Sequence, residues 1–113
     1  MSNPLTTHVL DTASGRPAAG LPILLERFVD GRFEAAGSGV TNADGRLDAP
    51  LISDGWQAGV YRIRFDTGAY FASQGSRGFY PYVEVVFEVT QPDEHHHVPL
   101  LLSPYGYSTY RGS

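Results

Sequence analysis

The sequence predicts an all-β protein, an antiparallel β-sandwich of seven or eight short strands with one short helix. Short runs along the chain alternate between apolar and polar residues with the period of two that is typical of strands. Thirteen glycines and eight prolines, which favour turns, are spread over the whole length and separate these runs. Many short strands joined by such turns are typical of a two-layered sandwich.

In the N-terminal half, alternation predicts strands at 5–10, 21–28 and 33–41, the third weakened by two internal glycines. The segment 42–45 reads Asn-Ala-Asp-Gly and predicts a turn whose glycine takes the left-handed position. We expect a further short strand at 46–49, followed by a loop.

In the C-terminal half, Tyr61, Ile63 and Phe65 alternate with charged residues and predict a half-buried strand. The segment 67–74 predicts the one helix, with Thr67 as its N-cap and Gly75 beyond its end. The last strands are expected at 83–89, 95–102 and 105–111.

Composition limits the class of protein. With 42% hydrophobic and 18% charged residues, the 113-residue chain suits one globular domain over 1–113. The absence of cysteine excludes disulfides, a thiol nucleophile and a thiolate zinc site. A net charge of −4 argues against a nucleic-acid surface, and the apolar runs are too short to cross a bilayer. Without a visible signal peptide or peroxisomal tripeptide, we expect a soluble cytoplasmic protein that binds neither nucleic acid nor membrane.

Alternation within 95–102 divides its histidines between two faces. His96 shares a face with three apolar residues that suit a core, Val98, Leu100 and Leu102. His95 and His97 then lie on the outer face with Pro99 and Leu101. We interpret His96 as a polar residue near the exposed end of its strand.

The strand at 5–10 divides in the same way. Its inward set is Leu5, Thr7 and Val9, and its outward set is Thr6, His8 and Leu10. If the two strands are neighbours, His8, His95 and His97 share one outer surface. Surface histidines are often only solvated polar residues, and a pair two apart on a strand can also bind adventitious zinc. Apolar residues on the same face nevertheless favour a subunit interface that contains a site.

Separated segments of the chain resemble the transthyretin-related (transthyretin-like) family. They are 5–11 (LTTHVLD), 41–46 (TNADGR), 79–82 (FYPY) and 97–113 (HVPLLLSPYGYSTYRGS). The ending YRGS is similar to the signature of the hydrolase branch, which thyroxine-carrying members lack. The resemblance covers essentially the whole chain and implies a prealbumin-like sandwich.

The resemblance implies hydrolysis of 5-hydroxyisourate to 2-oxo-4-hydroxy-4-carboxy-5-ureidoimidazoline in urate degradation. The positions that match the family's catalytic set are His8, Arg46, His97 and Ser113. The positions expected to contact substrate are Tyr110, Arg111 and Gly112. The family also implies a homotetramer with its sites at the dimer–dimer interface.

This chemistry needs a positioned water, a base and a donor for the developing oxyanion. Histidine suits the base, so His8 and His97 are expected to activate the water, in an order that the sequence leaves open. Arg46 suits the oxyanion, although spacing alone favours an exposed turn arginine. Ser113 offers a hydroxyl and a terminal carboxylate that orient water or an imidazole.

Other functions stay open at this point. Zinc-dependent hydrolysis is less favoured, because a catalytic zinc recruits a carboxylate or a third well-placed ligand, so we expect no cofactor and no metal. A small-ligand carrier with a transthyretin-like channel is the main alternative to an enzyme. A sandwich-type interaction module is a weaker one.

Overall fold

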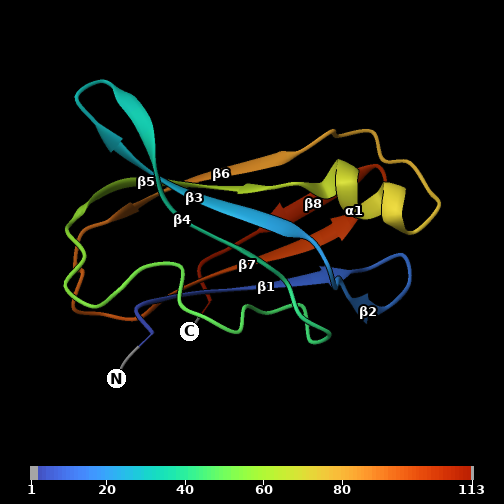
Figure 1. The fold of residues 1–113 in the computed structure, drawn as a ribbon, viewed down its shortest axis with the longest axis horizontal. Helices are drawn as coiled ribbons and strands as arrows, with labels where there is room; N and C mark the ends of the chain where they lie inside the picture. The colour runs from blue at the N-terminus through green and yellow to red at the C-terminus, as the bar shows by residue number, and fades with distance from the viewer. Residues whose placement is uncertain (1–2, 113) are drawn as a thin grey trace.

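The structure is a computed structural model that describes residues 3–112. Its strands form two four-stranded sheets with the orders β2-β1-β7-β8 and β4-β3-β5-β6, which pack face to face (Figure 1). The elements are β1 (Leu5–Asp11), β2 (Arg16–Pro17), β3 (Pro22–Val29), β4 (Arg32–Val40), β5 (Gly59–Phe65), α1 (Thr67–Ser73), β6 (Val83–Val89), β7 (His96–Ser103) and β8 (Gly106–Thr109). The predicted β-sandwich with one short helix is confirmed.

The pair formed by β1 and β7 positions the candidate site. These strands are neighbours and run parallel, whereas the other strand pairs of the described residues are antiparallel. A parallel pair needs a long connection, and here the whole second sheet lies between the two strands in sequence. Their register places Thr6 opposite His97 and His8 opposite Pro99. The adjacency on which the shared histidine surface depended is therefore present.

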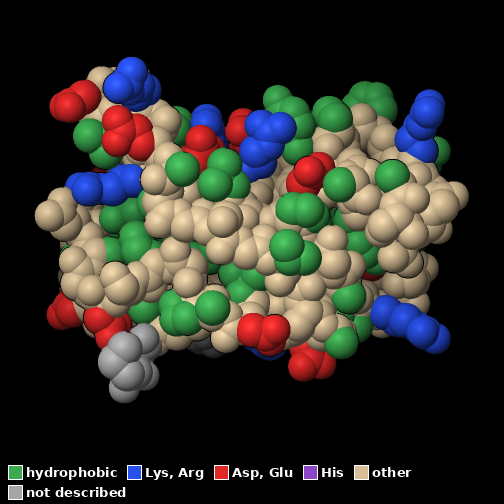
Figure 2. Space-filling model, viewed as in Figure 1, with side chains coloured by type: hydrophobic (Ala, Val, Ile, Leu, Met, Phe, Trp, Pro, Cys, Tyr) green, Lys and Arg blue, Asp and Glu red, His purple; other side chains and the backbone are tan. Residues whose placement is uncertain are grey.

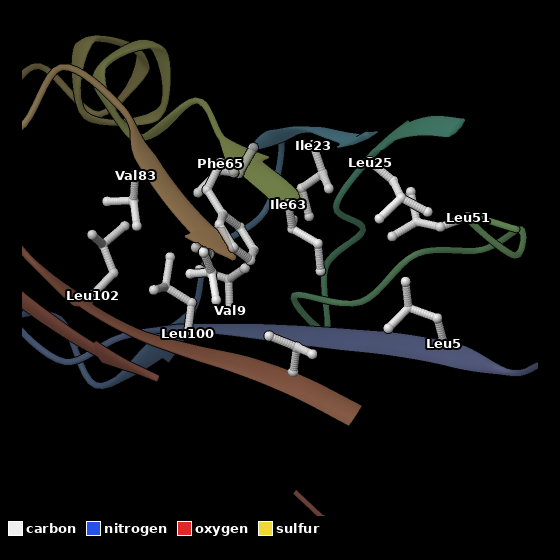
Figure 3. Close-up of a cluster of buried hydrophobic side chains, with 14 of the residues drawn as sticks. Leu5, Val9, Ile23, Leu25, Leu51, Ile63, Phe65, Val83, Leu100 and Leu102 are labelled. Atoms are coloured by element: carbon white, nitrogen blue, oxygen red, sulfur yellow. The ribbon is translucent and has the colours of Figure 1, made fainter. Parts of the chain in front are cut away.

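The core lies between the two sheets, as the close-up shows (Figure 3). Side chains from β1 and β7 point toward side chains from β3, β5 and β6. The inward set predicted for the first strand and for 95–102 is buried, with Val9 and Leu100 each 0% exposed. Complete burial of one such aliphatic side chain contributes roughly 1.5–3 kcal/mol. This packing leaves the opposite faces of β1 and β7 for other uses.

The helix α1 differs from the prediction at its first turn. Asp66 is the N-cap, and its carboxylate accepts a hydrogen bond from the amide of Ala69 at 3.3 Å. Thr67, predicted as the cap, is instead completely buried, and its hydroxyl donates to the carbonyl of Tyr80. A carboxylate at the preceding position can reach the free amides of the first turn, which leaves the threonine free to pack. The helix ends at Ser73, and Gly75 follows with a φ of 72°.

The segment 41–49 forms the predicted turn but not the predicted strand at 46–49. Gly45 takes the left-handed conformation with a φ of 73°. The side-chain oxygen of Asn42 accepts hydrogen bonds from the amides of Asp44 and Arg46, at 2.8 and 3.2 Å. The side-chain amide nitrogen of Asn42 donates to the carboxylate of Asp48. These side-chain bonds hold the backbone of 42–48 in bends, so it does not extend into a ladder.

Two smaller differences concern the edges of the first sheet. The two-residue strand β2 was not predicted, and β8 covers only part of the predicted 105–111. Beyond β8 the chain returns to β7 through an isolated bridge between Gly112 and His97.

The visible surface is mixed in charge. Figure 2 shows basic and acidic side chains interspersed around the rim of this face, without a large basic patch among the coloured residues. Among the described residues, no helix has the length and apolar character needed to cross a membrane.

Candidate active site

The outer faces of β1 and β7 carry the candidate site. His8 and His97 both alternate with buried neighbours and are half-buried on this face. The register places them two residue pairs apart along the two strands, because His97 is opposite Thr6 and His8 is opposite Pro99. Pro99, expected on the outer surface, is buried within the chain. The face therefore brings two imidazoles together beside a covered proline.

The hydroxyl of Thr6 connects His95 with His97, and these two residues together with His8 are called the histidine row below. Oγ1 of Thr6 lies 2.8 Å from Nδ1 of His97 and 3.0 Å from Nε2 of His95. The other ring nitrogen of His95, Nδ1, lies 2.8 Å from the backbone carbonyl oxygen of Asn3. His95 thus joins the outward cluster, although it precedes β7 and is exposed.

The turn 42–46 carries Arg46 to the opposite side of β1 from β7. The Gly45 carbonyl accepts a 2.9 Å hydrogen bond from the amide of Val9, which attaches the turn to β1. A side chain at Gly45 would meet the carbonyl oxygen of Val9, and its Cβ would lie 3.3 Å from Cδ2 of His8. Glycine therefore allows the close approach of the turn to His8 and the left-handed backbone that comes directly before Arg46.

The electrostatic environment favours a neutral His97. Burial lowers the pKa of His97 below its ordinary value of 6.5, and the positive charge of Arg46 lowers it further. His95 and His8 act in the same direction. A neutral imidazole at physiological pH has a free lone pair, which is the form that a general base requires.

The C-terminal segment closes the other side of His97. The amide of Gly112 donates a 2.8 Å hydrogen bond to the His97 carbonyl. A Cβ on Gly112 would collide with the His97 ring, so the backbone at this residue lies directly against the imidazole. Gly112, predicted to contact substrate, is thus part of the wall around His97. Ser113 lies outside the described residues.

The other predicted contact residues lie on the inner side of β7. Tyr110 and Arg111 line a pocket of about 270 Å³ together with Val98 and His96, whose side chains face the other way from His97. Arg111 also pairs with Glu94 at 3.3 Å. Its guanidinium also donates to the backbone carbonyl of His95 at 3.4 Å, and the contact of Tyr110 and Arg111 with substrate stays a prediction.

His96 differs from its interpretation as a residue near an exposed strand end. It is only 5% exposed, and its ring contacts the edge of the Trp56 indole at 5.4 Å between centroids. Its Nδ1 lies 2.9 Å from the carbonyl of Glu94. It faces the core, as the alternation predicted, but the loop with Trp56 covers it, which strand periodicity cannot indicate.

The site is an open face rather than a closed cavity. Thr6 and Arg46 line one pocket of about 160 Å³ with Asn3, Leu47 and others, beside the histidine row. Within residues 3–112, no group of three or more His, Cys, Asp or Glu side chains is arranged to hold a metal ion. The imidazoles of His95 and His97, joined through the Thr6 hydroxyl, lie on the same face as His8 and near Arg46. Such a set is suited to moving a proton and binding an anionic oxygen.

Thr6 is the site residue for which the sequence suggested no role. Its signal was present, because period-two alternation placed it on the outward face with His8. Only the pairing with β7 shows that its hydroxyl meets His97.

Known proteins resemble the chain over nearly its whole length. The model of the HIUase/Transthyretin family matches residues 5–112. The chain belongs to this family. A 5-hydroxyisourate hydrolase from Halalkalibacterium halodurans is 50% identical, with 100% of both chains covered. The family resemblance noted from the sequence is thus confirmed.

Solved structures of the HIUase/Transthyretin family show the same sandwich. A 5-hydroxyisourate hydrolase from Klebsiella pneumoniae has a TM-score of 0.82 and 38% identity, with 96% of this chain and 92% of that chain covered. Sea bream transthyretin in complex with thyroxine has a TM-score of 0.88 and 37% identity, with 96% and 94% covered. Backbone similarity therefore does not by itself distinguish a hydrolase from a thyroxine-binding transthyretin.

Proposed function

We propose that this chain hydrolyses 5-hydroxyisourate to 2-oxo-4-hydroxy-4-carboxy-5-ureidoimidazoline in urate degradation, by attack of a histidine-activated water on a ring amide. One observation supports this mechanism most directly: His8 and His97 share one outward sheet face, where burial and then the positive charge of Arg46 lower the pKa of His97. The chain is an enzyme of the hydrolase branch, half identical over its full length to a protein named 5-hydroxyisourate hydrolase.

His97 is the proposed general base. Because burial and Arg46 lower its pKa, it is unprotonated at neutral pH and can accept a proton from water. The resulting hydroxide oxygen bonds to the ring carbonyl carbon, and a tetrahedral intermediate forms. When the carbon–nitrogen bond of the ring breaks, the leaving nitrogen takes up a proton. His8, on the same face and two residue pairs along the strands, is the second imidazole available for this transfer.

Arg46 is the proposed oxyanion donor. Its guanidinium stays protonated throughout and presents a planar set of N–H donors. The charge that lowers the pKa of His97 also stabilises the negative oxygen of the intermediate. The Asn42 side chain and the bond from Val9 to Gly45 hold the backbone of the turn in place, which fixes the point from which the Arg46 side chain extends.

The C-terminal residues are proposed to complete the substrate pocket. Gly112 lies against His97, so Ser113, the next residue in the chain, is proposed to orient water or an imidazole. Tyr110 and Arg111 are proposed to act on substrate only after the chain has associated with further copies, since in one chain they line the inner pocket.

A homotetramer with sites at a dimer–dimer interface accompanies this proposal. The outer face that carries His8 and His97 also carries Leu10 and Leu101, which are paired across β1 and β7. Tyr105, near the end of the same sheet, is 80% exposed. Apolar side chains beside an open site favour a surface that a second copy covers. Sedimentation that shows a fully active monomer at micromolar concentration would contradict this assembly.

The decisive experiment follows the ultraviolet decay of freshly made 5-hydroxyisourate against its spontaneous rate. The wild-type chain is expected to accelerate this decay, and His8→Asn and His97→Asn to lower turnover by about a hundredfold or more each. Circular dichroism should show that both variants stay folded, because neither side chain fills the core. Wild-type turnover in a folded His97→Asn variant would refute the assignment of the base.

A small-ligand carrier is the alternative function, favoured by the similarity to thyroxine-bound sea bream transthyretin. A carrier binds an aromatic ligand without turnover, and its binding does not require His97. Decay of 5-hydroxyisourate at the spontaneous rate, together with saturable thyroxine binding, would favour the carrier.

A further inference from the structure

We propose that Thr6 and His95 are positioning residues that fix the tautomer of His97, leaving its Nε2 unprotonated. This inference rests on the proposed function only for its catalytic consequence, since the tautomer itself is a property of the free protein. Thr6 and His95 would then serve the site by fixing the position of the His97 proton, without contact with the substrate.

The direction of the hydrogen bonds starts at Asn3. A backbone carbonyl oxygen can only accept, so the 2.8 Å contact requires Nδ1 of His95 to carry a proton and donate it. A neutral imidazole has one N–H and one lone pair. The Nε2 atom of His95 is therefore an acceptor in the neutral ring.

Thr6 transmits this direction to the next ring. Its hydroxyl has a single proton, and the acceptor Nε2 of His95 lies 3.0 Å away. When the hydroxyl donates to His95, its oxygen accepts from Nδ1 of His97, at 2.8 Å. The proton of a neutral His97 consequently lies on Nδ1, and Nε2 carries the lone pair.

The consequence is a preorganised base. A histidine without such a partner distributes its proton over both nitrogens, and the fraction protonated at the reacting nitrogen cannot accept a proton from water. The bond to Thr6 also holds the ring orientation, while Gly112 packs on its other side. Burial is the largest cause that lowers the pKa of His97, followed by Arg46 from the turn and the neighbouring His95 and His8, while a backbone bond to Thr6 acts in the opposite direction. The net shift favours the neutral ring that these hydrogen bonds require.

The first experiment reads the tautomer directly. Long-range ¹H–¹⁵N correlation spectra of histidine-labelled protein at about pH 8, where histidine is neutral, distinguish protonated from unprotonated ring nitrogens. The His97 signals are assigned by their loss in His97→Asn. We expect an unprotonated Nε2 and a protonated Nδ1 in the wild type. A His97 ring protonated mainly at Nε2 would overturn the proposal.

Matched variants then remove each step of the chain. Thr6→Val keeps the side-chain shape but removes the hydroxyl, so protonation at Nε2 of His97 should rise, whereas Thr6→Ser should preserve the wild-type spectrum. His95→Asn withdraws the acceptor from Thr6, because its shorter side chain does not reach the position of Nε2, whereas His95→Gln retains an acceptor near that position. Thr12→Val is the control, because Thr12 lies just beyond the other end of β1 and its hydroxyl donates to the backbone carbonyl of Leu102.

Kinetics test the catalytic consequence. Thr6→Val should lower kcat about tenfold with KM changed less than about twofold, and Thr6→Ser and Thr12→Val should stay near wild type. A Thr6→Val protein with wild-type tautomer and kcat would overturn the inference even if the enzyme is active. If no variant, including the wild type, hydrolyses 5-hydroxyisourate while the spectra are as expected, the proposed function fails and the tautomer assignment stands.

Discussion

The imidazole of His97 packs against the backbone of Gly112, and the Gly112 amide donates a 2.8 Å hydrogen bond to the His97 carbonyl. The proposed base is therefore held between two segments that are far apart in sequence, with Thr6 of β1 on one side and the C-terminal segment on the other. Close packing of this kind leaves no room for a side chain at residue 112.

Replacement of Gly112 by alanine should impair catalysis while the fold persists. The new Cβ would lie 3.2 Å from Cγ and 3.3 Å from Cβ of His97 and closer still to the ring edge, so the imidazole must move. We expect kcat to fall about tenfold or more, because small displacements of a reacting group are costly. Gly106→Ala is the control, since its Cβ would meet only the Ser103 hydroxyl at 3.8 Å. Equal turnover in both variants would show that the Gly112 contact is unimportant.

The acid limb of the pH profile should report His97 and its neighbour Arg46. The base works in its neutral form, so kcat/KM should fall as pH decreases through the pKa of His97, which lies below 6.5 because of burial and then Arg46. Arg46→Gln removes a positive charge and should move the midpoint upward, in addition to lowering kcat. Arg46→Lys retains the charge and should leave the midpoint in place. A midpoint that is the same in all three proteins would show that the charge of Arg46 does not act on the group that titrates.

Zinc should inhibit rather than activate. Nε2 of His95 and Nδ1 of His97 both face the Thr6 hydroxyl, so an ion bound to these nitrogens would break the bonds that orient His97. We expect chelator-treated protein to keep full activity and added zinc to inhibit it, with weaker inhibition in His95→Asn. Loss of activity on chelation, restored by zinc, would support a metal-dependent mechanism instead.

Tyr70→Phe should destabilise the chain without affecting the histidine row. The Tyr70 hydroxyl donates a 2.8 Å hydrogen bond to Asp11, a carboxylate that is only 6% exposed. Loss of a donor to a buried carboxylate costs about 1–3 kcal/mol in the free energy of unfolding, measurable in urea, whereas Tyr105→Phe at an exposed position should cost almost nothing.

The same bond predicts a loss of stability at alkaline pH. Burial, with the Asp11 bond second, raises the pKa of Tyr70 from 10.0 to about 12. A raised pKa in the folded state means that this contribution is complete below pH 10 and is lost as pH rises toward 12. Unfolding free energies measured across this range should decline less steeply for Tyr70→Phe than for the wild type.

Period-two alternation alone determined which side chains of two strands face outward. Successive side chains of a strand point to opposite faces whatever the strand pairs with, so His8 and His97 could be placed outside and Val9 and Leu100 inside from local pattern. The turn at 42–45 was also readable, because Gly45 needs its left-handed conformation for local reasons. The family resemblance then indicated which outward residues have functional importance.

Tertiary structure decided everything that depends on which segments meet. The parallel pairing of β1 with β7 brings Thr6 to His97, although these two residues are 91 positions apart in the sequence. Burial of His96 under Trp56, and the use of Asp66 rather than Thr67 as the helix cap, depend on packing between distant segments. Strand periodicity describes only the direction of a side chain. Its partners, its burial and hence the pKa of His97 arise from long-range contacts that form when the two sheets and the C-terminal segment assemble.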